Sequence, residues 1–284
     1  MNHVEIYTDL RNYDCRLPSC WEEIQSAKWP ALARFVAGGD IYYRDVVFLL
    51  GEYKTRFGWR PLPKGLKKTL PAPELGLLFG CLSWMLLDPC ITPIKKRIKV
   101  NGRWYHLPGP AMRNTVIIEF ATADMCYEVS RMYSGKNRYR DADLWLNKMC
   151  AYICRPIDPT INELDPERFA GDLREKFNSA IIEKRMAEFN HISPEDRYQA
   201  LMFFTGTKRH MRSQFKYVWP RTHTDSGEAL MNVTVSNKPE PKRWLNAIRR
   251  LAGGKYGDYE KTCYTPTYVI MEEIEQQLQT NLTT

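Results

Sequence analysis

The second half of the chain carries a succession of helical patterns separated by turn residues, and this feature constrains the fold most. Helices of this kind are expected at about residues 118–134, 141–153, 168–190 and 194–218. The last begins most clearly, because Ser193 is a favoured capping residue and Pro194 suits a first helical turn. The sequence therefore predicts a mainly α, multi-helix globular protein.

One strong strand signal precedes these helical patterns. Arg97–Val100 and Arg103–His106 alternate polar with apolar or aromatic residues and flank Asn101-Gly102, a pair that accepts the positive φ angles of a type I′ turn. We predict one small β-hairpin at about 96–107. An isolated hairpin is only marginally stable, so it should pack on the helices or on a partner. Residues 4–8 (VEIYT) are compatible with another short strand.

The first ninety residues contain shorter helical patterns. Ser19 followed by Glu22 forms a capping box, which predicts a helix start at Trp21. Apolar stripes over 42–57 and 74–87 predict two more helical segments. The proline- and lysine-rich stretch between them is expected to be a loop with a basic surface.

The break at Pro108-Gly109-Pro110 is the expected domain boundary. The polar segment 220–240 is typical of a linker, and amphipathic helices are predicted at 242–251 and 268–278. Small helices of this kind need a host surface. We therefore expect three parts, a helical region with the hairpin, a helical domain, and a linker with C-terminal helices, at residues 1–110, 111–220 and 221–284.

Charge, cysteines and hydropathy limit the class of protein. The 41 basic and 33 acidic residues give a formal net charge of +8, which permits an acidic or nucleic-acid partner without requiring one. The eight cysteines include no CxxC pair, and Cys150 and Cys154 lie one helical turn apart in apolar surroundings, as buried thiols do. Residues 1–16 carry no export signal and no apolar run reaches membrane-spanning length. We expect a cytoplasmic protein without membrane contact.

No known catalytic motif is present. The chain contains no GxSxG elbow, Walker loop, HExxH or GxGxxG sequence. The close carboxylates Asp141 and Asp143 lie at an expected helix start, where the helix dipole favours negative charge. His191 and His210 stand without metal-ligand spacing. We expect no catalytic residue, no cofactor and no metal, and hence a protein that is not an enzyme.

Basic and aromatic residues give two sets of candidate interface residues. The segment from Lys208 to Arg212 has aromatic neighbours, so Arg209 and Arg212 are candidates for contact with a nucleic-acid backbone. We favour the simpler interpretation that its apolar members fill a core while its charges face water. Most tryptophans fall on apolar stripes, but Trp59 and Trp104 are candidate interface anchors.

Short motifs follow one another in a recognisable order. They are Leu17-Pro18-x-x-Trp21-Glu22-Glu23, Gly109-Pro110, Asn114-Thr115-x-x-x-Glu119-Phe120, Ala123-Asp124, Arg155-Pro156 and Ala200-Leu201-x-Phe203-Phe204. In this order the chain resembles Bacteroidetes-type phage and prophage proteins over most of 17–220. Residues 114–218 resemble phage tail assembly chaperones, whereas the first 110 residues depart from the shorter chaperone pattern.

The resemblance implies a helical scaffold that binds the tape-measure protein of a phage tail before the tail tube assembles. It carries over no catalytic residue. The motif residues are expected to fix helix packing, with Arg155 paired to Glu119, and they are Trp21, Glu119, Phe120, Arg155 and Pro156. Alternatives are a structural virion component, such as a connector or tail-associated protein, and a nucleic-acid-binding protein that uses the basic segments. A homo-oligomer is compatible with each of these functions.

Overall fold

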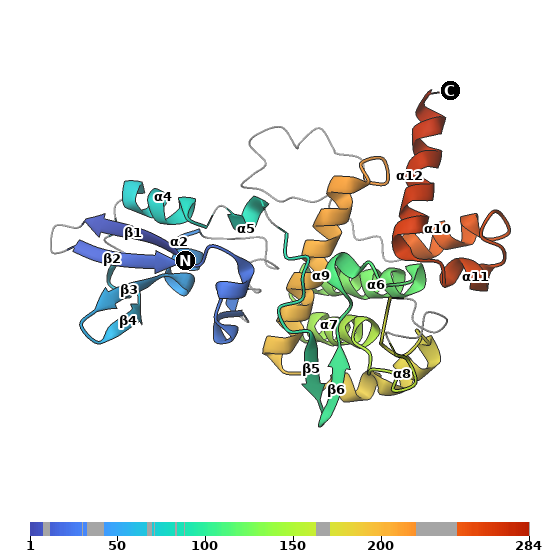
Figure 1. Cartoon of the computed structure of the whole chain (residues 1–284), viewed down its shortest axis with the longest axis horizontal. Coiled ribbons are helices and arrows are strands. Elements are labelled where there is room, and N and C mark those ends of the chain that lie inside the picture. The colour runs from blue at the N-terminus through green and yellow to red at the C-terminus, as the bar shows by residue number, and fades with distance from the viewer. Residues whose placement is uncertain are drawn as a thin grey trace. The chain divides into compact units, whose positions relative to one another are not determined.

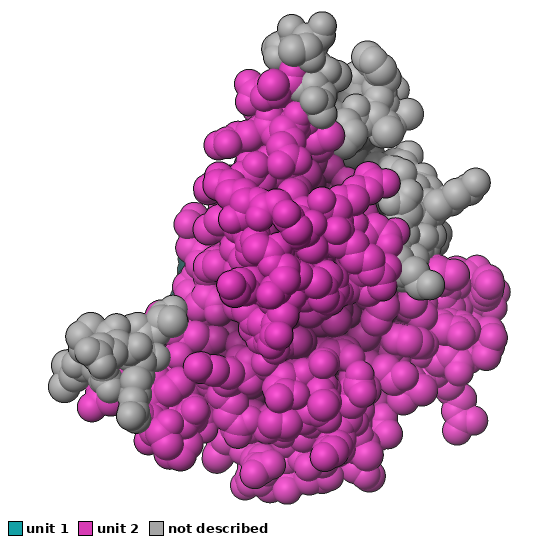
Figure 2. All heavy atoms as spheres, turned by 90° about the vertical axis from the view of Figure 1, so that its right-hand side faces the viewer, with its two compact units in different colours: residues 1–90, 226–234 teal, residues 91–225, 235–284 magenta. Residues whose placement is uncertain are grey.

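The computed structural model describes residues 1–7, 12–29, 31–32, 43–66, 70, 72–82, 84–87, 89–162, 171–219 and 243–283. These residues form two compact units, one within 1–90 and the other from Ile91 onward. Figure 2 shows one face of the second unit. The expected boundary at Pro108-Gly109-Pro110 falls inside the second unit. The hairpin therefore belongs with the helices that follow it.

The first unit is built on a four-stranded antiparallel sheet in the order β1-β2-β3-β4 (Figure 1). Its strands are β1 (Asn2–Tyr7), β2 (Asn12–Leu17), β3 (Glu52–Thr55) and β4 (Gly58–Pro61). Its helices are α2 (Tyr43–Leu50), α4 (Ala72–Gly80) and α5 (Trp84–Leu87), with 3₁₀ turns at Trp21–Glu23 and Ser26–Lys28. The buried side chains of Ile6, Cys15 and Leu17 lie on the core face of the sheet.

This sheet corrects the expectation of a single hairpin, although the chain is mainly α. The apolar stripe over 42–57 is helical only as far as Leu50, and β3 follows at once. The basic stretch expected to be a loop contains β4. The apolar run 74–87 is divided into α4 and α5, and the helix expected at Trp21 is a single 3₁₀ turn. These strands are four to six residues long, and β2 pairs with the distant β3, so local periodicity does not reveal the sheet.

The second unit packs helices around α6 and α7, two long helices that contact each other extensively. Its helices are α6 (Ile117–Ser134), α7 (Tyr139–Ile153), α8 (Ser179–Phe189), α9 (Pro194–Gln214), α10 (Arg243–Leu251), α11 (Tyr259–Cys263) and α12 (Thr267–Thr283). Its strands are β5 (Arg97–Val100) and β6 (Arg103–His106). A 3₁₀ turn at Pro110–Met112 leads into the helices.

The local predictions for this unit are largely confirmed. The hairpin forms about a type I′ turn, with φ of 47° at Asn101 and 81° at Gly102. The predicted cap of α9 is present, because Ser193 Oγ accepts a hydrogen bond from Asp196 N at 3.0 Å. Helix α8 begins only at Ser179, so the helix predicted over 168–190 is wrong across 171–178.

The C-terminal predictions fare similarly. Helices α10 and α12 match the two predicted segments, and α11 between them was not predicted. The linker predicted at 220–240 lies outside the described residues. Among the helices that the structure describes, none is both long and apolar enough to cross a bilayer.

Gly51, between α2 and β3, gives a test of the first unit. A Cβ at this position would lie 2.5 Å from Leu62 Cδ1 and 2.7 Å from the carbonyl oxygen of Val47. The carbonyl cannot move without disturbing the end of the helix. We expect Gly51→Ala to lower the free energy of unfolding by about 1–3 kcal/mol, as measured by urea unfolding.

Gly65→Ala is the matched control, because nothing lies within 4 Å of the Cβ that it would add. The free energy of unfolding of this variant should lie within about 1 kcal/mol of that of the unchanged protein. Equal stability of the two variants would contradict the close packing of Gly51.

Candidate functional site

The most deeply buried charges of the second unit converge on Glu119 of α6. The side chain of Glu119 is fully buried, and its two oxygens face different arginines. Arg155 Nη2 lies 2.8 Å from Oε2, and Arg174 Nη1 lies 3.0 Å from Oε1. The ion pair expected between Arg155 and Glu119 is therefore present. Arg174 is a second partner that the sequence analysis missed.

Asp172 completes what we call the Glu119 cluster: Glu119, Arg155, Asp172 and Arg174. The Asp172 carboxylate lies 2.9 Å from Arg155 Nη2 and 2.8 Å from Arg174 Nη2, so two positive and two negative groups balance. Arg174 also donates to the carbonyl oxygen of Ile153 at 2.8 Å. Complete burial raises the pKa of Glu119, against the attraction of both arginines. The cluster holds residues 172–174 against α6 and the end of α7.

The backbone around Arg155 explains how the cluster forms. Helix α7 ends at Ile153, and the buried Pro156 favours an extended conformation for the residue before it. Arg155 forms an antiparallel bridge with His106 of β6, and Ile157 forms one with Arg174. The hairpin, the segment after α7 and the segment before α8 are thus joined side by side.

A second buried group surrounds Lys208 of α9, and we call it the Lys208 cluster: Lys208, Asp124, Glu128 and Trp244. Lys208 Nζ lies 2.8 Å from Glu128 Oε1 and also pairs with Asp124. Trp244 Nε1 donates to Asp124 Oδ2 at 2.8 Å. Burial alone would raise the pKa of Glu128, but attraction to Lys208 outweighs it and the pKa is lowered.

The Lys208 cluster changes the interpretation of the basic segment 208–212. Its first cation is buried and neutralised by carboxylates of α6, so the expectation that the charges of this segment face water is wrong for Lys208. The expectation that its apolar members fill a core is confirmed for Met211, which is fully buried. Arg209 is exposed, whereas Arg212 is half-buried. Arg209 and Arg212 therefore do not form one continuous exposed basic surface with Lys208.

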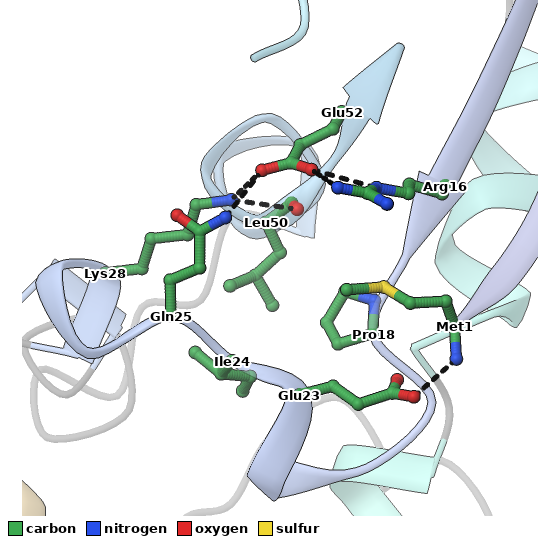
Figure 3. A pocket seen from close by; sticks show the side chains of 9 residues that line it. All are labelled: Met1, Arg16, Pro18, Glu23, Ile24, Gln25, Lys28, Leu50 and Glu52. Carbon is green, nitrogen blue, oxygen red and sulfur yellow. Dashed lines mark hydrogen bonds and ion pairs between the residues drawn. The ribbon is translucent and has the colours of Figure 1, made fainter. Parts of the chain in front are cut away.

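The first unit has a polar pocket around Glu52, drawn in Figure 3. Arg16 and Lys28 reach the carboxylate from two sides, at 2.8 and 3.3 Å. The remaining cavity volume is about 10 Å³, which is room for about one water molecule. This pocket is a filled ionic contact and cannot hold a substrate.

The aromatic candidates of the first unit are also accounted for by packing. Trp21 is 9% exposed, and its ring lies 4.9 Å from that of Trp84 and 6.0 Å from that of Trp29. Trp59 is half-buried, with the Arg16 guanidinium 4.3 Å from its ring. Trp59 is thus a weaker interface candidate than its sequence position indicated.

The second unit presents a different surface at the solvent face of the hairpin. Trp104 is 45% exposed, and the Arg97 guanidinium lies 4.4 Å from its ring centroid, with Lys99 Nζ at 5.7 Å. These side chains line an open groove of about 430 Å³ together with Lys95, Lys96, Ile98 and Asp196. We call it the hairpin groove, and its cations and exposed ring suit contact with an anionic partner.

The described residues contain no group of three or more His, Cys, Asp or Glu side chains placed to hold a metal ion. The buried charges are each paired, and the hairpin groove contains cations and an aromatic ring. Comparison of the chain with protein-family models, with curated proteins and with solved structures finds no match.

The Glu119 cluster should be essential for stability. Arg155→Leu leaves the buried Glu119 carboxylate and the half-buried Asp172 carboxylate with one arginine between them. We expect the free energy of unfolding of the second unit to fall by about 3–5 kcal/mol, measured by urea unfolding. Arg138→Leu is the control, because its ion pair with Asp141 is largely exposed and should contribute at most about 1 kcal/mol. Equal effects would contradict the importance of the buried cluster.

The Lys208 cluster should make stability depend on pH. Glu128 has a lowered pKa in the folded protein, so its stabilising contribution is present above the ordinary value of 4.5 and is lost as pH falls through the folded value. Glu128→Gln should be less stable near neutrality and should show a shallower fall in stability below pH 4.5. Unfolding curves recorded from about pH 3 to 7 give the change of stability with pH for the unchanged protein and for Glu128→Gln. The same dependence in both proteins would contradict a stabilising role of the Glu128 carboxylate.

Proposed function

We propose that this chain is a non-enzymatic protein that binds other proteins during phage assembly, and specifically a tail assembly chaperone for the tape-measure protein in the host cytoplasm. The observation that carries the proposal is the exposed ring of Trp104 on the hairpin of the second unit. The phage and chaperone assignment comes from the resemblance of the sequence motifs.

Trp104 has the properties of a binding anchor. Large aromatic side chains contribute much of the energy of protein interfaces. Contacts with Arg97 and Lys99 restrict the orientation of the ring before any partner arrives, and restricting a side chain in advance lowers the entropy cost of binding. The hairpin itself is held to the unit by the bridge between His106 and Arg155.

The motif residues support the proposal in a different way. Phe120 is fully buried, and its ring lies 5.9 Å from that of Phe204 and 5.7 Å from that of Trp244. Glu119 and Arg155 form a buried ion pair with each other, and Pro156, which follows Arg155 in the sequence, is buried. These residues maintain the shape of the unit, which is the role that a non-catalytic scaffold requires of them.

Of the alternatives, a structural virion component would use the same surface. A chaperone is absent from finished particles, so mass spectrometry of purified virions separates the two. Nucleic-acid binding through the segment 208–212 is less favoured, because the charge of Lys208 is buried and paired.

The proposed function is tested by co-expression with the tape-measure protein of the same phage. We expect the unchanged chain to raise the soluble fraction of that protein, and Trp104→Ala to weaken the complex about thirtyfold or more, because truncating an anchor residue costs at least about 2 kcal/mol. Co-purification and calorimetry measure the two effects.

Tyr139→Ala is the control for this test, because Tyr139 is also a large exposed aromatic residue, at 62%, but lies at the start of α7. It should bind as the unchanged chain does. A tape-measure protein whose solubility does not respond to the chain at all would overturn the chaperone proposal.

A further inference from the structure

Strand β5 has an open edge in the second unit. Val100 pairs with Arg103 across the two-residue turn, and Lys99 and Arg97 pair with Trp104 and His106. A type I′ turn makes the pair next to it a hydrogen-bonded pair, and such pairs alternate with non-hydrogen-bonded ones. The main-chain N–H and C=O groups of Arg97 and Lys99 therefore point away from β6.

On the opposite edge of the hairpin, which is formed by β6, the outward main-chain groups of His106 are hydrogen-bonded to Arg155. His106 N donates to the carbonyl oxygen of Arg155 at 2.7 Å, and Arg155 N donates back at 3.0 Å. In the described part of the chain, β5 and β6 make up a two-stranded sheet. The β6 edge is thus paired at His106, whereas within the described residues no main-chain hydrogen bond joins the outward groups of Arg97 or Lys99 to another segment.

The open edge is positively charged. Lys95 is neutralised by Glu195 and Asp196, at 2.9 and 3.0 Å. Among the described residues, Arg97 and Lys99 lie in no ion pair with a carboxylate, and both are exposed. Cations on an edge strand discourage pairing with a second basic strand. The same cations attract a strand that carries negative charge.

We propose that β5 binds an extended acidic segment of a protein partner by strand addition, in the hairpin groove. This inference rests on the proposed function, in that the chain binds proteins, and it names the chemistry of the partner. Every second side chain of an added strand lies on the same face. Acidic residues at alternate positions would therefore lie beside Arg97 and Lys99, with apolar residues between them on the other face.

A peptide fits this site better than a nucleic acid does. The unpaired N–H and C=O groups of β5 match the groups of another peptide backbone, whereas single-stranded nucleic acid binds through phosphates and through bases stacked on aromatic faces. The Arg97 guanidinium, 4.4 Å from the Trp104 ring, occupies one such face. An oligonucleotide is accordingly the competing ligand in the test.

The test uses the full chain and three labelled probes: an acetylated peptide of four Glu-Val repeats, the same peptide with Lys in place of Glu, and an oligothymidylate of twelve nucleotides. Fluorescence anisotropy measures binding at low salt. We expect the Glu-Val peptide to bind and the Lys-Val peptide to bind at least about tenfold more weakly, because its charges meet like charges.

Variants at Lys99 separate charge from backbone pairing. Lys99→Glu should lower the affinity for the Glu-Val peptide about tenfold or more. Lys136→Glu changes an exposed lysine between α6 and α7, and its affinity should stay within about twofold of that of the unchanged chain. Lys99→Ala and Lys99→Pro both remove the charge, but only proline also removes the edge N–H. The Lys99→Pro variant should therefore bind the Glu-Val peptide about fivefold more weakly than Lys99→Ala does, since a main-chain hydrogen bond is lost as well.

A Glu-Val peptide that is N-methylated at alternate residues tests the same hydrogen bonds without changing the protein, in case Lys99→Pro disturbs the hairpin. One of the two methylation registers should abolish binding. Equal binding of both methylated peptides and the parent would overturn strand addition. An oligothymidylate that binds as tightly as the Glu-Val peptide, and whose binding is lost in Lys99→Glu, would overturn the acidic strand in favour of nucleic acid.

The outcome is separable from that of the proposed function. A Glu-Val peptide that fails to bind, while Trp104→Ala still weakens the tape-measure complex, overturns the acidic strand alone. A Glu-Val peptide that binds with the expected dependence on Lys99, in a chain that does not affect the tape-measure protein, supports the inference and overturns the chaperone proposal.

Discussion

The burial of Glu119 is the constraint on which the second unit depends. A carboxylate without access to water is costly unless its oxygens are paired and hydrogen-bonded. Arg155 and Arg174 each take one oxygen, and Asp172 balances the second positive charge. Because these groups come from α6, from the end of α7 and from the segment before α8, a single buried charge determines where three parts of the chain must meet.

The position of the hairpin follows from the same arrangement. Arg155 uses its side chain for Glu119 and its main chain for His106 of β6. The backbone bonds therefore orient the hairpin relative to the cluster, and they use the edge of β6 while leaving that of β5 open. The exposed face of the hairpin is thus oriented by the bridge between His106 and Arg155, beside the buried ion pair of Arg155 with Glu119.

The sequence predicted the features that are encoded locally. The Asn101-Gly102 turn, the Ser193 cap and the long apolar stripes of α6, α7 and α9 each depend on neighbouring residues, and the expected pairing of Arg155 with Glu119 is present. Of the sheet in the first unit, the sequence indicated only a short strand at 4–8, which overlaps β1. The remaining strands have only four to six residues and give little periodicity, and β2 pairs with β3 across 36 residues, at Arg16 and Glu52.

The missing half of the Glu119 cluster has a different cause. The helix expected over 168–190 includes Arg174, and nothing in that expectation brings this arginine to Glu119. Gly171 adopts a φ of 82°, a conformation that favours glycine, and the chain is non-helical from there to Asn178. This glycine was the available signal for a break, because a glycine within a helical pattern lowers confidence in that pattern.

Two basic segments that look alike in the sequence differ in the fold, because one contains a buried positive charge and the other carries exposed ones. Segment 208–212 lies on α9, where helical periodicity turns Lys208 toward the carboxylates of α6. Segment 95–99 runs into a strand, whose alternation buries Ile98 and leaves Arg97 and Lys99 in solvent. The period of the backbone thus determines which positive charges remain available, and net charge alone could not distinguish the two segments.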